Sequence, residues 1–172
     1  MVTTILGRLA AGLLVLVTLA GMPAGAAETL PTPKGAVILT VSGKISATNA
    51  QGRADFDRAM LEGLGKATIK TSTPWTEGAP TFEGVPLARL LEAVGATGTT
   101  LRAVALNDYK SALPAKDADL GVLLALKMNG EPMRVRDKGP IWIIYPLDQN
   151  PALRNKTTHS RMVWQIKSIV VE

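Results

Sequence analysis

Apolar and polar residues along the chain follow patterns that predict about seven short strands and two helices. Strands are expected where apolar, often β-branched residues alternate or run together: 36–41, 67–71, 101–106, 120–128, 132–135, 141–145 and 165–171, with 110–113 as a further hairpin arm. One helix is indicated by apolar residues at i, i+4 and i+8 behind a capping Asp55, namely Phe56, Met60 and Leu64. A second begins at Pro86, ends at Gly95 and buries Leu87, Leu90, Leu91 and Val94.

The order of these elements indicates the fold class. Strands and helices do not alternate regularly, so a doubly wound parallel sheet is not expected. We predict an α+β fold with a mixed, largely antiparallel sheet and few short helices. Asn129-Gly130 predicts a tight turn between two strands. Trp142 alternates within the strand at 141–145 and is expected in the core.

The N-terminus is typical of a secretory signal peptide. Arg8 precedes an apolar run over 9–20, and small residues follow up to Ala27. The run is shorter than the roughly 20 residues that a membrane helix needs, although an uncleaved membrane anchor is the alternative. We predict a signal peptide over 1–27, cleavage after Ala26 or Ala27, a single domain over 28–172 and a periplasmic location.

Composition excludes several kinds of chemistry. The chain has no cysteine and one histidine, His159. A thiol nucleophile or a thiolate metal ligand is therefore not available. The net charge is +5, and residues 127–172 hold eight Lys or Arg against four Asp or Glu. This basic segment is either an anion-binding face or a solvated surface, and nucleic acid is not an expected partner because no basic cluster or RNA-binding motif is present.

Candidate ligand-binding residues gather in three segments at strand ends or in loops. They are Trp75 in the irregular segment 72–84; Asn107, Asp108 and Tyr109 after a predicted strand; and Arg136, Lys138, Arg161 and Trp164 toward the C-terminus. If these ends converge, they form a pocket with aromatic walls and a few polar groups. The tryptophans offer faces for a planar heterocycle, the Asp108 carboxylate accepts from adjacent N–H donors, and the cations suit an oxo group or an anionic tail.

Each candidate also has an ordinary structural explanation. Asp108 in a turn often bonds its own backbone, and Trp164 is equally consistent with a core position. Arg136 and Lys138 beside an acidic residue are consistent with plain surface charge. His159 is expected to be an ordinary loop residue. Spacing alone therefore does not identify a ligand class.

Several motifs, taken in order, resemble the oxidoreductase molybdopterin-binding domain, the fold of sulfite oxidases. They are Gly84-Val85-Pro86-Leu87, Leu90-Leu91, Gly95, Ala105-Leu106-Asn107-Asp108-Tyr109, Leu113-Pro114, Asn129-Gly130-Glu131-Pro132-Met133, Gly139-Pro140, Ile143-Ile144-Tyr145-Pro146 and Trp164-Gln165-Ile166. The resemblance covers roughly residues 35–172. It implies a sulfite oxidase-like fold and a pterin-type cofactor.

The chain departs from the family pattern at the metal. Catalytic members hold molybdenum through a cysteine, which would fall within 69–75, and this chain has none. The resemblance is therefore to a short, exported, cysteine-lacking branch that binds unconjugated pterins and acts as a sensor with a membrane-bound cyclic-di-GMP enzyme. It implies a non-catalytic pterin-binding protein without catalytic residues or metal ligands. The alternatives are a molybdenum-cofactor oxidoreductase with a non-cysteine metal site and a scaffold protein with a vestigial pocket.

Overall fold

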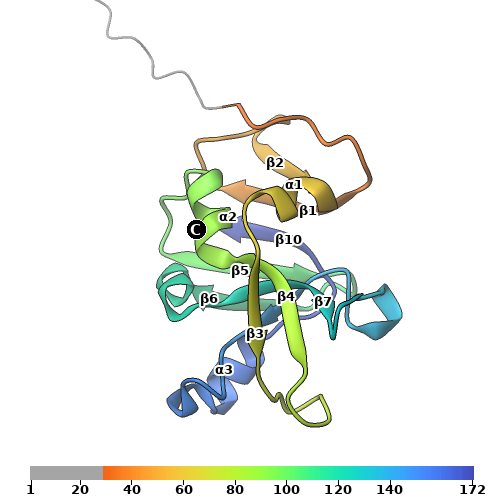
Figure 1. Cartoon of the computed structure of the whole chain (residues 1–172). Helices are drawn as coiled ribbons and strands as arrows, with labels where there is room; N and C mark the ends of the chain where they lie inside the picture. The colour runs from red at the N-terminus through yellow and green to blue at the C-terminus, as the bar shows by residue number, and fades with distance from the viewer. Residues whose placement is uncertain (1–28) are drawn as a thin grey trace, which may run out of the picture.

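The computed structural model describes residues 29–172 (Figure 1). The predicted signal peptide and its cleavage site lie outside these residues. Within the described part, no helix is both long enough and apolar enough to cross a membrane. Ten strands form two five-stranded sheets, and the short helices lie around them.

The first sheet has the strand order β2-β1-β10-β5-β6. Its strands are β1 (Val37–Gly43), β2 (Arg53–Asp57), β5 (Thr100–Ala105), β6 (Lys110–Pro114) and β10 (Ile166–Val171). β1 and β10 are parallel, whereas the other neighbours are antiparallel. The sheet brings together β1 and β10, the first and last strands of the described residues.

The second sheet is entirely antiparallel. Its strands are β3 (Ala67–Lys70), β4 (Thr81–Pro86), β7 (Leu123–Met128), β8 (Glu131–Pro132) and β9 (Trp142–Ile144), in the order β3-β4-β7-β8 with β9 also paired to β7. β4 was not predicted, because it includes both Gly84 and Pro86. Gly84 is needed there, since a Cβ at this position would lie 2.7 Å from the Ala125 Cα on the facing strand.

Three α-helices and three 3-10 helices connect the strands. They are α1 (Arg58–Gly63), α2 (Leu87–Ala93), α3 (Lys156–Arg161), η1 (Ala115–Leu120), η2 (Val135–Asp137) and η3 (Pro151–Leu153). The prediction that Asp55 caps the first helix is wrong: Asp55 lies in β2, and Asp57 caps α1 by accepting from the Met60 N–H at 2.8 Å. The pKa of Asp57 is lowered mainly by this bond and by the N–H of Gly35.

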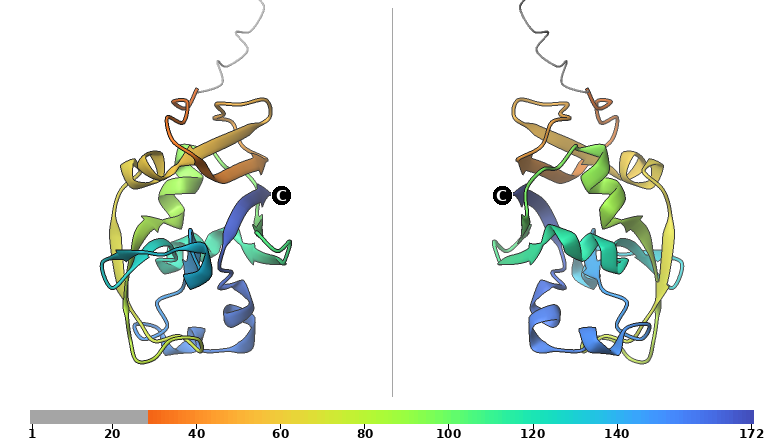
Figure 2. Two further views of the ribbon diagram at one scale, coloured as in Figure 1. Left: turned by 90° about the vertical axis from the view of Figure 1, so that its right-hand side faces the viewer. Right: turned by 90° about the vertical axis from the view of Figure 1, so that its left-hand side faces the viewer.

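The mixed, largely antiparallel α+β fold is confirmed, and so is the core position of Trp142, whose side chain is fully buried. Buried side chains of both sheets and of α2 form one continuous cluster. Figures 1 and 2 show α3 and the loop between β3 and β4 at one end of the molecule, opposite β1 and β2. The candidate site lies at this end.

Candidate functional site

A cavity of about 280 Å³ opens where three segments meet. The segments are the β3–β4 loop, the β5–β6 turn, and α3 with the residues that follow it. The nine lining residues are Trp75, Ala105, Asn107, Tyr109, His159, Ser160, Met162, Val163 and Trp164. Four of the eight predicted ligand-binding residues are therefore brought together: Trp75, Asn107, Tyr109 and Trp164. We refer to this site as the aromatic cavity.

Two tryptophans form a corner of the aromatic cavity. The ring centroids of Trp75 and Trp164 are 5.2 Å apart and their planes are inclined at 73°. The rings thus meet edge to face, and a flat ligand would stack on one ring and touch the edge of the other. Trp75 is 37% exposed, whereas Trp164 is half-buried. Behind them the buried Trp142 contacts Trp164 edge to face at 6.2 Å and donates from Nε1 to the Met162 carbonyl.

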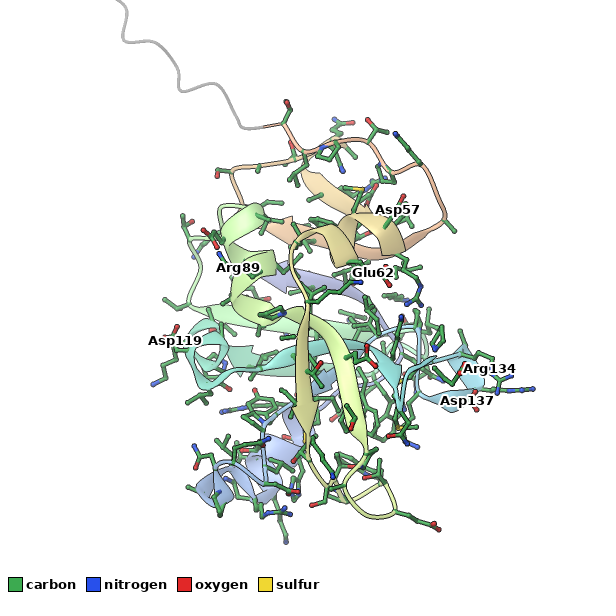
Figure 3. The ribbon with its side chains drawn as sticks, viewed as in Figure 1. Asp57, Glu62, Arg89, Asp119, Arg134 and Asp137 are labelled. Atoms are coloured by element: carbon green, nitrogen blue, oxygen red, sulfur yellow. The ribbon has the colours of Figure 1, made fainter. Side chains whose placement is uncertain are left out.

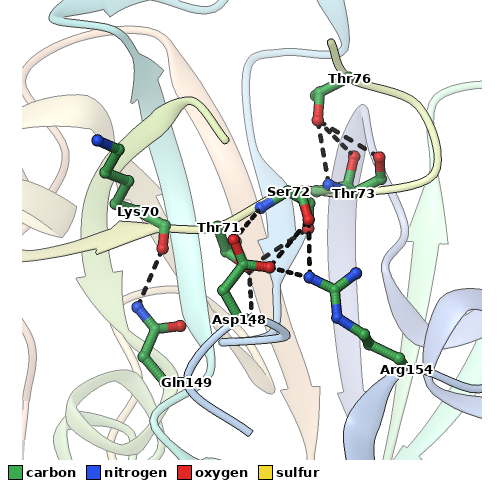
Figure 4. A network of polar contacts seen from close by, with 8 residues as sticks. All are labelled: Lys70, Thr71, Ser72, Thr73, Thr76, Asp148, Gln149 and Arg154. Atoms are coloured by element: carbon green, nitrogen blue, oxygen red, sulfur yellow. Dashed lines mark hydrogen bonds and ion pairs between the residues drawn. The ribbon is translucent and has the colours of Figure 1, made fainter. Parts of the chain in front are cut away.

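The loop that carries Trp75 is held by side chains on both sides (Figure 4). Within the loop, the Thr73 hydroxyl accepts from the Trp75 N–H at 3.2 Å. Just before Thr73, Ser72 donates its N–H to Asp148 at 3.0 Å and its hydroxyl to the same carboxylate at 2.9 Å. Asp148 also pairs with Arg154. These bonds lower the pKa of Asp148, the backbone N–H of Ser72 contributing most. The exposed indole is therefore presented by an anchored loop.

The β5–β6 turn aims its residues in opposite directions. The Asn107 side-chain oxygen accepts from the Tyr109 N–H at 3.2 Å, and both residues line the aromatic cavity. Between them, Asp108 has a φ of +63° and donates its N–H to the Ala105 carbonyl. Its carboxylate pairs with Lys167 at 2.6 Å, which lowers the pKa of Asp108. Asp108 is therefore a turn residue outside the cavity lining, in contrast to the predicted contact with a ligand.

The three predicted cations also lie outside the cavity lining. Arg161 donates from Nη1 to the buried Asp117 at 2.9 Å, and the same carboxylate oxygen accepts from the Tyr145 hydroxyl at 2.6 Å. Arg136 is 72% exposed, at the protruding η2 segment whose Asp137 is labelled in Figure 3. Lys138 is half-buried, with Nζ 5.6 Å from the centre of the Trp142 ring. Arg136 lies 3.8 Å from the carboxylate of its neighbour Asp137, so only Arg161 has a partner from a distant part of the chain.

His159 is not the loop residue that was expected. It lies in α3, lines the cavity, and its ring is 6.1 Å from the Trp75 ring at 72°. Asn155 caps α3 by accepting from the Thr158 N–H at 2.9 Å. The sequence contained one signal for this helix, the capping residue Asn155. It showed no apolar stripe, because the one buried residue of α3 is the polar Thr158.

Comparison with known proteins decides the family. The model of the oxidoreductase molybdopterin binding domain matches residues 50–148, which is more than half of the chain. This protein belongs to that family. A solved structure, the sulfane dehydrogenase SoxCD from Paracoccus pantotrophus, is similar with a TM-score of 0.57 and 18% identity, over 77% of this chain and 37% of that one. This likeness shows the fold alone, and the chain spans little more than a third of that protein. No curated protein matches.

Membership of the molybdopterin-binding family indicates a pterin-type cofactor. The matched residues 50–148 include one half of the aromatic cavity, namely Trp75, Ala105, Asn107 and Tyr109. The other half, from α3 to Trp164, lies beyond the match. The aromatic cavity of this molybdopterin-binding domain is therefore built partly by the family core and partly by the C-terminal segment.

Proposed function

We propose that this protein is exported and binds an unconjugated pterin in the aromatic cavity, without holding molybdenum and without catalysis of its own. The observation that carries the proposal is the cavity lining: two tryptophan rings and four polar side chains, with no Lys or Arg among the nine residues. A flat, uncharged ring system with polar edges matches such a lining.

The residues do not fit the metal of the molybdenum cofactor. A soft thiolate is the protein ligand expected for such a metal, and the chain has no cysteine. Among residues 29–172, no three His, Cys, Asp or Glu side chains gather closely enough to hold a metal ion. His159 is the one lining residue with a strong donor atom for a metal. The donor set therefore supports a pterin site rather than a metal site.

The cavity also favours a small pterin over a phosphate-bearing one. Its volume of about 280 Å³ is at the lower end of the roughly 300–1,000 Å³ that small-molecule sites occupy, which suits a small ligand. A phosphate tail would require cationic or backbone N–H partners. Arg161, the nearest predicted cation in sequence, is bound to Asp117 instead. A bicyclic ring without an anionic tail meets both conditions.

The polar lining residues supply hydrogen bonds for the edges of the ring. Asn107 retains two amide donors, because its side-chain oxygen already accepts from the Tyr109 backbone. The Tyr109 hydroxyl and the imidazole of His159 can each donate or accept, whereas the Ser160 hydroxyl donates to the Thr157 carbonyl at 2.8 Å and can accept. Together they can satisfy an amino-oxo pyrimidine edge while Trp75 or Trp164 stacks on the ring.

The resemblance to the exported, cysteine-lacking branch extends the proposal to signalling. In this role, pterin binding would bias the protein toward the conformation recognised by the periplasmic part of a membrane-bound cyclic-di-GMP enzyme. A ligand shifts such an equilibrium only by its difference in affinity for the two conformations. The N-terminal signal-peptide pattern supports a location where the two proteins can meet.

Titration of the purified protein with pterin, followed by tryptophan fluorescence, tests the proposal. Stacking of a planar base on an aromatic side chain contributes about 1–3 kcal/mol, so Trp75→Leu should weaken binding about fivefold to 150-fold. Leu120→Ser, an exposed apolar position on η1 outside the cavity lining, is the matched control and should bind like the wild type. Equal affinity of Trp75→Leu and wild type contradicts the site, and stoichiometric molybdenum in the exported protein contradicts the absence of the metal.

A further inference from the structure

We propose that His159 is a hydrogen-bond acceptor for the N–H edge of the pterin, so that the protein binds its ligand near neutral pH and releases it in acid. This inference rests on the proposed pterin function and adds to it a residue that determines specificity and a dependence on pH. His159 is the one histidine of the chain, and its half-buried side chain lines the aromatic cavity. An imidazole is the side chain that ordinarily changes its charge between pH 5 and 8.

The His159 ring is positioned by packing and keeps its nitrogens free. It meets the Trp75 ring edge to face, with the ring centroids 6.1 Å apart. No hydrogen bond or ion pair joins either ring nitrogen to another described residue. Among these residues, the one fully buried side-chain nitrogen or oxygen without a partner belongs to Arg58. The unpaired nitrogens of His159 are therefore open to the cavity or to solvent.

The side chains of the cavity offer few acceptors for an N–H edge. A 2-amino-4-oxo pyrimidine ring presents N–H donors from its amino group and from the neighbouring ring nitrogen. The Asn107 side-chain oxygen already accepts from the Tyr109 N–H at 3.2 Å, and its amide nitrogen only donates. The hydroxyls of Tyr109 and Ser160 can accept. A neutral His159 adds a further acceptor to this short set.

Backbone carbonyls of the lining add little to the supply of acceptors. Five of the nine lining residues already accept a hydrogen bond at their carbonyl from a group of the protein. These residues are Ala105, Tyr109, His159, Met162 and Val163. The ligand therefore depends on side-chain acceptors, and the loss of one acceptor should weaken binding.

Protonation of His159 removes this acceptor and places a charge in the cavity. In an imidazolium both nitrogens carry a proton, so neither can accept. The N–H edge of the ligand would then face another N–H, and a donor left without its acceptor is costly. The lining contains no Asp or Glu that could compensate the charge. Binding of the pterin edge to His159 therefore requires the neutral imidazole.

Carboxylates on the segments around α3 are mostly taken by other cations. Asp117 of η1 pairs with Arg161, which is on α3 itself. Asp148 pairs with Arg154 beside the β3–β4 loop, and Asp108 in the β5–β6 turn pairs with Lys167. The other charged side chains on α3, on η1, on the β3–β4 loop and on β6, which packs against α3, are all exposed: Glu77, Lys110, Lys116, Asp119 and Lys156.

Equilibrium dialysis of the whole protein against pterin, at pH 5 and at pH 7.5, tests the inference. The pterin ring is uncharged at both values. About 3% of an ordinary imidazole is neutral at pH 5, so the affinity of the wild type should be at least fivefold lower there than at pH 7.5. His159→Phe should bind weakly at both values, because it has no acceptor. His159→Gln has an acceptor that does not titrate, so it should bind more tightly than His159→Phe and equally at both values.

A matched control and a spectroscopic readout separate this role from a general effect of acid. Lys156→Gln removes an exposed charge of α3 outside the lining and should lose affinity in acid as the wild type does. Because the chain has one histidine, its imidazole proton resonances can be followed directly by NMR. Saturating pterin should move the midpoint of their titration to lower pH, since ligand and proton oppose each other reciprocally.

Each contrary result overturns a defined claim. Equal affinity of the wild type at the two pH values, or an imidazole titration that pterin leaves unchanged, overturns the role of His159. A loss in acid that persists in His159→Gln assigns the pH dependence to another group and overturns it as well. The NMR titration needs the wild type alone and is decisive even if a variant is unstable. Absence of pterin binding at both values overturns the proposed function, whereas binding that is independent of pH leaves that function standing and overturns this inference alone.

Discussion

Replacing Asp117 with Asn tests whether a buried charge cluster holds the α3 side of the aromatic cavity. One oxygen of Asp117 accepts from the Tyr145 hydroxyl at 2.6 Å and from Arg161 at 2.9 Å. The carboxylate side chain is 5% exposed and the Arg161 side chain 24%. Tyr145 is fully buried, and burial together with its bond to Asp117 raises its pKa, so the hydroxyl stays the donor. Arg161 ends α3, directly beside the cavity residues Ser160 and Met162.

The expected cost follows from the exposure of the two charges. Removing one partner of a fully buried ion pair costs about 3–5 kcal/mol, because the other charge is left without compensation. Here the Arg161 side chain keeps about a quarter of its surface in water, so Asp117→Asn should lower the free energy of unfolding by about 2–3 kcal/mol. Tyr145→Phe removes one hydrogen bond and leaves the ion pair intact, so it should cost about 1–2 kcal/mol.

Urea denaturation followed by tryptophan fluorescence measures both effects. The midpoint should fall while the dependence of the unfolding free energy on urea is unchanged. The double variant Asp117→Asn/Arg161→Met should be less destabilised than the sum of its single variants, since the two groups are coupled. A loss below about 0.5 kcal/mol for Asp117→Asn, the level of an ordinary surface substitution, would refute the reasoning.

Three further results are expected. The pKa of Asp148 is lowered from 3.8 by its bonds to Ser72, so the stabilisation by its carboxylate is complete above pH 3.8 and is lost as the pH falls through the lower pKa of the folded state. The difference in unfolding free energy between wild type and Asp148→Asn, measured by urea titration across pH 2–7, should therefore shrink in acid. A difference that stays constant across this range would contradict the expectation. Gly84→Ala should destabilise by about 1–3 kcal/mol in thermal unfolding, because its Cβ would meet the backbone of β7; an unchanged melting temperature would contradict the close approach. Asp108→Ala should change pterin affinity less than threefold in calorimetry, because its carboxylate pairs with Lys167 outside the cavity; a tenfold loss would return Asp108 to the site.

Local patterns were sufficient for most of the first sheet and for part of the second. β1, β5 and β10 are apolar or alternating runs, and β7 is followed by the predicted Asn129-Gly130 turn. The pattern failed for β2, whose Phe56 was predicted to lie in a helix, and also for β4 and α3. β4 contains Gly84, which is needed because the neighbouring strand β7 passes close to it, and ends at Pro86. α3 is polar nearly all round and forms through its Asn155 cap and tertiary contacts.

The aromatic part of the candidate site was predictable because few aromatic residues were available to build it. With aromatics at 4% of the chain, Trp75 and Trp164 were conspicuous in segments without a regular pattern. His159 was missed because nothing local indicated that a polar helix would bring it beside Trp75. Arg161 lies outside the cavity lining for a related reason, since local sequence does not show that it will meet Asp117.

The sequence alone indicated the α+β class, the absence of thiolate chemistry and the aromatic character of the candidate site. These properties depend on composition and short-range periodicity. Only the tertiary structure decided which polar groups face the cavity. Arg161 is taken by Asp117, 44 residues away, and Asp108 by Lys167, 59 residues away. Such pairs form when packing brings distant segments together, so local sequence does not show which side chains they will join.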